Sequence, residues 1–131
     1  MKKSTQFRPD FKRVESGLKF NGRAAIDRMY DHVWEQYRIA FLKHNPTCYA
    51  CGLKSQVVDH LTPHKGDETL FKQTTNHIPL CNKCHNTVTS LFDKKYVRKN
   101  PITPKLTWLA KMRIDYQIDI KVKVLPKYGP T

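Results

Sequence analysis

The residues best suited to chemistry are the four cysteines of the chain, which fall in two Cys-x-x-Cys pairs. Cys48 and Cys51 form the first pair, and Cys81 and Cys84 form the second. Together they supply four thiolates, which satisfy tetrahedral Zn²⁺ and leave no coordination position open. The sequence therefore predicts a closed structural zinc site, and a site of this kind does not by itself indicate catalysis.

Further ligand-type residues lie between the two pairs and just after them. A Val-Val-Asp-His run ends with Asp59 and His60, Asn76 stands five positions before Cys81, and His85 follows the last cysteine. Hydrolysis of a phosphodiester needs a water nucleophile, a base and positive charge near the phosphate. A neutral imidazole can be the base near pH 7, and a carboxylate with one imidazole leaves most positions of a hard cation open. These residues suit metal-dependent phosphodiester hydrolysis.

The same segment has a short strand, loop, strand, helix pattern. Residues 55–60 are rich in strand formers, and residues 76–80 form a second candidate strand after a turn region. Residues 82–93 can continue as a helix. We therefore expect zinc to clip the entry of the first strand to the start of the helix.

Side-chain directions favour one part of this site and constrain another. On a helix, Cys84 and His85 point about 100° apart, so one can face zinc while the other faces the hairpin. In a regular strand, Asp59 and His60 point to opposite faces. We expect both to serve one site only if the strand ends, twists or bulges there.

Three stretches resemble the HNH endonucleases, which have the ββα-metal nuclease fold: VVDHLTPHKGD, NHIPLC and CNKCHN. The zinc-bearing type found in bacteriophages is the most similar, and the upstream stretch YDHVWEQYRIAFLKHNPTCYACG resembles its lead-in helix. The resemblance covers roughly residues 29–93. It implies an α+β fold, namely a ββα-metal core with a structural four-cysteine zinc site, flanked by an N-terminal helix and a C-terminal helix-strand extension.

The resemblance also implies a role for each matching residue. His60 corresponds to the general base and Asn76 to the residue that orients it. Asp59 and His85 correspond to the ligands of a catalytic divalent ion, Mg²⁺ or Mn²⁺. His64 is a candidate contact to substrate or metal. The implied reaction is DNA cleavage, as nicks or double-strand cuts, with 5′-phosphate and 3′-hydroxyl products.

Charge points to a polyanionic partner, because the formal net charge is +13 and the pI is about 9.8. Most of the excess lies outside the centre: residues 1–47 hold ten Lys/Arg against five acids, and residues 97–131 hold eight against two. We expect double-stranded DNA as the partner, with the flanks on backbone phosphate. The implied phage origin makes DNA-packaging proteins candidate partners too.

We divide the chain into a basic arm (residues 1–22), a nuclease domain with its lead-in helix (residues 23–96) and a basic extension (residues 97–131). Residues 24–44 predict one amphipathic helix. In the extension, residues 105–117 predict a helix with Leu106, Leu109, Met112 and Tyr116 inward, and the alternation over residues 118–125 predicts a half-buried strand.

The sequence has no run long enough to span a membrane, and no apolar region follows the initial MKKS as in a signal peptide. With the thiols on metal, we expect the reducing cytoplasm, that of the host cell for a phage protein.

Other functions stay open at this stage. The chain could be a non-catalytic zinc module that binds DNA or protein, or a subunit that cuts only within a larger assembly. RNA is a less favoured substrate, because the sequence has no evident aromatic platform for single strands.

Overall fold

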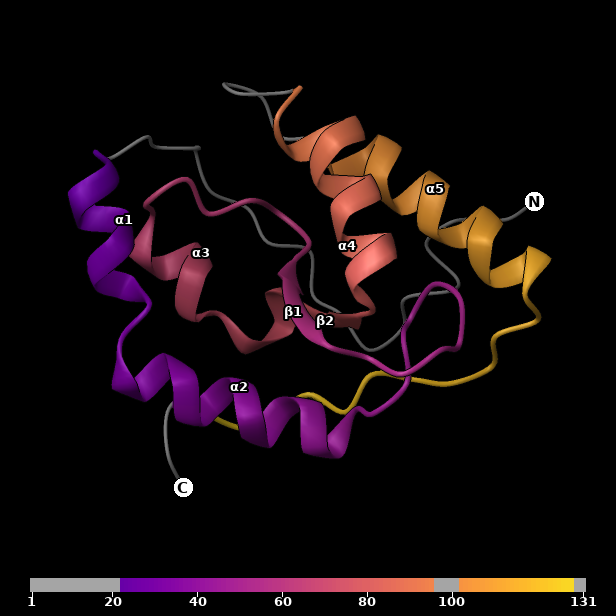
Figure 1. The fold of residues 1–131 in the computed structure, drawn as a ribbon, viewed down its shortest axis with the longest axis horizontal. Coiled ribbons are helices and arrows are strands. Elements are labelled where there is room, and N and C mark those ends of the chain that lie inside the picture. Colours follow the sequence, from indigo (N-terminus) through magenta and orange to yellow (C-terminus); the bar gives the residue numbers. More distant parts are fainter. Residues whose placement is uncertain (1–21, 96–101, 129–131) are drawn as a thin grey trace.

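A computed structural model describes residues 22–95 and 102–128 of the chain, so nearly all of the predicted basic arm lies outside it. The described part is α+β, with helices around one two-stranded sheet (Figure 1). In chain order the elements are α1 (Arg23–Met29), α2 (His32–His44), β1 (Val57–His60), α3 (Glu68–Lys72), the 3₁₀ turn η2 (Thr74–Asn76), β2 (His77–Leu80), α4 (Asn82–Val88), the π-helical turn η3 (Thr89–Asp93) and α5 (Ile102–Asp115).

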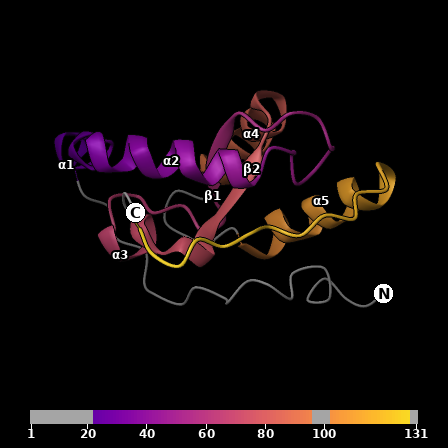
Figure 2. The ribbon, with the colours of Figure 1, turned by 90° about the horizontal axis from the view of Figure 1, so that it is seen from below.

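The sheet is an antiparallel hairpin, as the two predicted strands require. Its register pairs Val57 with Leu80 and His60 with His77. Figures 1 and 2 place the hairpin between α2 on one side and α5 on the other. The two faces of β1 therefore meet different helices, and its side chains alternate between them.

A small knuckle precedes the hairpin and carries the first cysteine pair. Thr47 bridges to Lys54, and the Cys48 N–H donates to Leu53 O at 2.6 Å. Gly52 closes the turn with φ +84°, and a Cβ there would lie 2.8 Å from Ile118 Cδ1. This position favours glycine for its left-handed backbone, and the end of the Ile118 side chain would have to move to admit a Cβ.

The predicted helix over residues 24–44 is in fact two helices. The chain leaves α1 at Tyr30, and Asp31 begins α2 by accepting a hydrogen bond from Trp34 N at 3.0 Å. A side chain that caps a helix favours a new start over continuation of the preceding one. Of the predicted apolar stripe, α2 buries Trp34, Tyr37 and Phe41.

The strand predicted over residues 118–125 is wrong, although its alternation is real. Val122 is buried between exposed lysines, yet the segment pairs with no strand of the described chain. Side chains take the place of a ladder partner: Asn45 accepts from Lys123 N at 2.7 Å and donates to Lys123 O at 3.0 Å, and Arg113 donates to Ile120 O at 2.7 Å. Periodicity reports which side chains face the core, and it does not report what satisfies the backbone.

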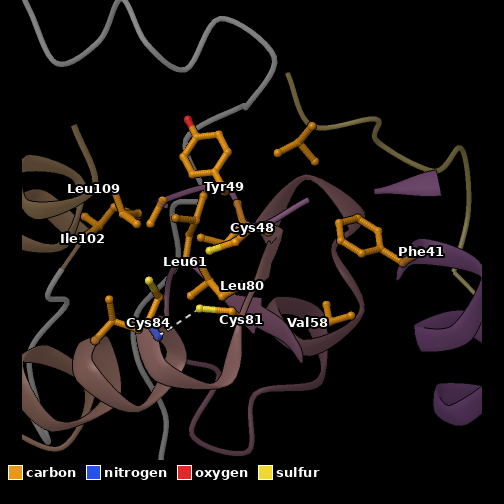
Figure 3. Close-up of a cluster of buried hydrophobic side chains, with 14 of the residues drawn as sticks. Phe41, Cys48, Tyr49, Val58, Leu61, Leu80, Cys81, Cys84, Ile102 and Leu109 are labelled. Carbon is orange, nitrogen blue, oxygen red and sulfur yellow. Dashed lines mark hydrogen bonds between the residues drawn. The ribbon is translucent and has the colours of Figure 1, made fainter. Parts of the chain in front are cut away.

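The predicted C-terminal helix exists, and Leu106, Leu109 and Met112 face the core as predicted. The buried residues of α5 are Ile102, Lys105 and Leu109, while Tyr116 is exposed. Ile102 and Leu109 join the same buried cluster as Cys48, Leu80 and Cys84 (Figure 3). No helix within the described ranges has the length and apolar character to cross a membrane.

Asn45→Ala tests whether the C-terminal segment depends on this side-chain clamp. Asn45 is buried and also donates to Phe41 O at 3.0 Å, so the change removes three hydrogen bonds and leaves the N–H and C=O of Lys123 without these partners. We expect the free energy of unfolding to fall by about 2 kcal/mol in zinc-saturated buffer. Denaturant unfolding of the exposed Asn86→Ala variant is the matched control, and equal stability of the two variants would contradict the clamp.

Candidate metal centre and buried polar site

The four cysteines converge at the start of α4, where the knuckle meets the helix. Their sulfurs all lie within 4.8 Å of one another, and the Cys51 and Cys81 sulfurs are 3.7 Å apart. Tetrahedral Zn²⁺ with bonds of about 2.3 Å separates its sulfurs by about 3.8 Å. All four are free thiols, because 3.7 Å is far longer than a disulfide bond. The cluster therefore fits a zinc ion, as the sequence predicts.

Local backbone geometry favours the thiolate form of Cys81 within this cluster. Cys81 is the N-cap of α4, and its sulfur accepts from Cys84 N at 3.4 Å. Burial opposes ionisation of Cys81, but the helix N–H and the neighbouring thiols bring its pKa below the usual value. Burial and the nearby Cys48 raise the pKa of Cys84. A divalent cation at the centre of the cluster would offset the repulsion between neighbouring thiolates and so favour their ionisation.

A second group of polar side chains surrounds the buried carboxylate of Asp59, near the end of β1. Asp59 Oδ1 lies 3.0 Å from His85 Nδ1, so the strand and α4 meet here as the helix geometry predicts. Asp59 Oδ2 lies 2.9 Å from Lys105 Nζ, an ion pair without hydrogen-bond geometry. The Lys105 ammonium also donates to His60 O at 2.7 Å and to both Asp93 oxygens, at 3.1 and 3.2 Å.

The charges in this group set one another's pKa values. Burial alone would raise the pKa of Asp59, but Lys105 and His85 hold it below its usual value. Burial would lower the pKa of Lys105, but the two carboxylates raise it. Asp93 has a pKa raised to about 6, because burial and the Asp59 charge outweigh the attraction of Lys105. Asp59 is thus anionic and Lys105 cationic at neutral pH.

His60 leaves β1 on the other side of the hairpin, among aromatic rings. Its ring stacks with Trp34 and Phe71, at centroid distances of 5.6 and 5.2 Å. His60 Nε2 lies 3.1 Å from Phe71 O. Because a carbonyl can only accept, Nε2 carries the proton and Nδ1 keeps the lone pair. Burial, then the neighbouring histidines, hold the pKa of His60 well below its usual value, so the ring is neutral at pH 7.

His77 shares the same carbonyl and lies opposite His60 in the hairpin. Its Nε2 donates to Phe71 O at 2.8 Å, and its Nδ1 accepts from the Tyr37 hydroxyl at 2.6 Å. The ring is fully buried and both nitrogens are used, which fits a structural role. Burial lowers its pKa to about 4.

Asn76 closes the loop between the two strands. Its side-chain oxygen accepts from Thr62 N at 2.8 Å, and its amide donates to Thr62 O at 2.9 Å and Leu70 O at 3.1 Å. Because the side chain binds both backbone groups of one residue, it acts as an extra rung beyond the strand pairing. It touches the loop that follows His60 and not the His60 ring.

His64 comes to the same place from the loop, with both ring nitrogens already bonded. Its Nδ1 accepts from Gly66 N at 3.0 Å, so its Nε2 is the donor to the Tyr30 hydroxyl at 2.9 Å. Its ring centroid is 4.8 Å from that of His60. Burial, then the charge of Lys65, lower the pKa of His64 to about 4. A protonated ring would lose the bond from Gly66.

The structure thus gathers the predicted residues in two connected places: Asp59 with His85, and His60 with His64. Lys105 and Asp93 belong to the first place, and the sequence interpretation gave neither a role there. A signal exists for Lys105, because it falls between Ile102 and Leu109 at the three- and four-residue spacing of a buried stripe. A lysine at such a position is buried and needs partners.

No protein-family model and no curated protein matches the sequence.

Cys81→Ser tests the predicted zinc site. The change removes one ligand and the N-cap thiol of α4, and metal binding in such a cluster is coupled to folding. We expect the variant to lose stoichiometric zinc and cooperative unfolding, measured by metal analysis and circular dichroism. Stripping zinc from the wild-type chain with a strong chelator should reproduce the effect. A folded, zinc-free variant would contradict the prediction.

Acid should destabilise the protein partly through His64. Its folded pKa of about 4 lies below the unfolded value of 6.5, so the unfolded chain binds the proton first. The stability that this ring contributes is complete above pH 6.5 and is lost as the pH falls towards 4. We expect His64→Gln to reduce the loss of unfolding free energy between pH 7 and pH 5 by about 1–2 kcal/mol. An unchanged pH slope would show that His64 does not stay neutral.

Proposed function

We propose that this protein is a metal-dependent DNA endonuclease of the HNH type. The observation that carries the proposal is the meeting of Asp59 Oδ1 and His85 Nδ1 at 3.0 Å, with a neutral His60 as the next residue along the same strand. A single base and a single anchored cation are together sufficient for the hydrolysis of a phosphodiester. The motifs shared with phage HNH enzymes and the net charge of +13 support the same reaction on DNA.

Asp59 and His85 are the residues that would hold the divalent cation. Two adjacent ligands of an octahedral Mg²⁺ or Mn²⁺ lie about 3.0 Å apart, which is the separation of these two atoms. When bound, the cation would polarise the phosphate and stabilise the charge of the leaving 3′ oxygen. His85 is one-third exposed, so this edge of the site is open to a substrate.

His60 would take the proton of the attacking water at Nδ1. Phe71 O binds the proton on Nε2 and so fixes the tautomer that leaves Nδ1 basic. Stacking against Trp34 and Phe71 restricts rotation of the ring. Asn76 would act at one remove, by holding the turn that follows His60.

His60→Gln is the decisive variant, because a Gln amide can still donate to Phe71 O but cannot accept the water proton. We expect cleavage of supercoiled plasmid, with Mg²⁺ or Mn²⁺ added, to fall by at least about 10³-fold while zinc content and DNA binding persist. The exposed His44→Ala is the matched control and should cut normally. A reaction without added cation is a better blank than one with a chelator, which would also strip zinc.

The outcomes separate this proposal from its rivals. Open-circle or linear product that needs both His60 and added cation supports the nuclease. Plasmid that is retarded but never cut, across several cations, favours a non-catalytic zinc module that binds DNA. Weak nicking that rises when packaging proteins are added favours a subunit of a larger assembly.

A further inference from the structure

Lys105 reaches the Asp59 carboxylate from α5, outside the segment that holds the cysteines and histidines. Its side chain has no exposed surface, and Nζ lies within 3.2 Å of oxygens from Asp59, Asp93 and the backbone of His60. The ammonium group therefore lies among oxygens from β1 and η3, where it occupies a position that a bound cation could otherwise take.

Docking of α5 does not explain this arrangement. Ile102 and Leu109, one turn to either side, already anchor the helix in the apolar cluster. An apolar residue between them would serve the same purpose, because a buried ion pair seldom adds net stability over a well-packed apolar group. The reason for a lysine at this position is therefore to be found in its effect on the Asp59 carboxylate.

The effect of Lys105 on the site can be counted in charges. Asp59 and Asp93 supply two negative charges and Lys105 one positive charge, which leaves the site at −1. Lys105 also separates the two oxygens of Asp59: Oδ2 faces the ammonium, and only Oδ1 faces His85. Both oxygens of Asp93 are within 3.2 Å of the ammonium, so Asp93 pairs with Lys105 and does not join Asp59 as a third ligand.

We propose that Lys105 is a positioning residue that limits the affinity of the Asp59–His85 pair for divalent cations and makes Asp59 a single-oxygen ligand. The inference rests on the proposed function, since it takes the same pair as the cation site. A site of charge −1 attracts a divalent cation less than a site of −2 does. The cation is then held firmly only when a DNA phosphate adds its own negative charge, which couples metal binding to substrate binding.

A charge cycle on the zinc-loaded full chain tests this, with the dissociation constant for Mn²⁺ measured by the paramagnetic resonance of free Mn²⁺ in the absence of DNA. Asp93→Asn removes one negative charge, and we expect it to weaken binding by about tenfold. Lys105→Gln removes the positive charge, and we expect it to tighten binding by about tenfold. The double variant restores the charge of −1 and should return close to the wild-type value.

The opposite directions of the two single variants are what a purely structural role cannot produce, since loss of a structural pair would weaken binding in both. Equal constants for all four proteins, or weakening in both single variants, overturns the inference. If Lys105→Gln does not fold, as zinc content and circular dichroism would show, Lys105→Met takes its place, because it removes the charge and keeps an unbranched side chain of similar length. Tighter Mn²⁺ binding by Lys105→Met supports the inference, and unchanged or weaker binding overturns it.

His85→Ala in the same assay separates this inference from the proposed function. Loss of wild-type Mn²⁺ binding in His85→Ala confirms the site, whatever Lys105 does to its affinity. Mn²⁺ binding that is absent from both the wild type and Lys105→Gln, or that His85→Ala leaves unchanged, overturns the cation site of the proposed function and this inference with it.

Discussion

The register between β1 and β2 determines where the polar side chains of the candidate site lie. Asp59 and His60 are neighbours in β1, so a slip of one residue would exchange the helices that they face. Hydrogen bonds beyond the ladder help to hold the register: Tyr49 N donates to Pro79 O, and the Asn76 side chain binds both backbone groups of Thr62. The hairpin is only four pairs long, so these additional hydrogen bonds contribute much of what fixes its register.

The fixed hairpin divides the buried polar groups by chemical type. The side towards α4 and α5 carries charge, in Asp59 and Lys105, while the side towards α2 and α3 carries neutral imidazoles among aromatic rings. Aromatic burial favours uncharged histidine, and the carboxylates favour a cation. The pKa of Asp59 and the pKa of His60 are therefore both lowered, but by different surroundings, which leaves a carboxylate and a neutral imidazole side by side in the sequence, as the proposed cation ligand and base require.

The sequence predicted best where one local pattern determines one contact. Two Cys-x-x-Cys pairs could meet only as a cluster, and the 100° step between Cys84 and His85 placed the imidazole on the hairpin side of α4. It predicted least where a distant partner decides. The capping of α2 by Asp31 competes with helix continuation, the clamp of Asn45 replaces a strand partner, and the burial of Lys105 depends on Asp59, 46 positions earlier in the chain.

The thiol cluster and the Asp59 group are joined through the first turn of α4. Cys81 caps this helix, Cys84 faces the cluster, and His85, the next residue, faces Asp59. A zinc ion at the thiols would thus fix both the start of the helix and the direction of the His85 ring, although it would be closed to substrate. Such an ion would position His85 and would not itself react. In the proposed function, binding of the divalent cation would therefore depend on zinc, whereas binding of zinc would not depend on the divalent cation.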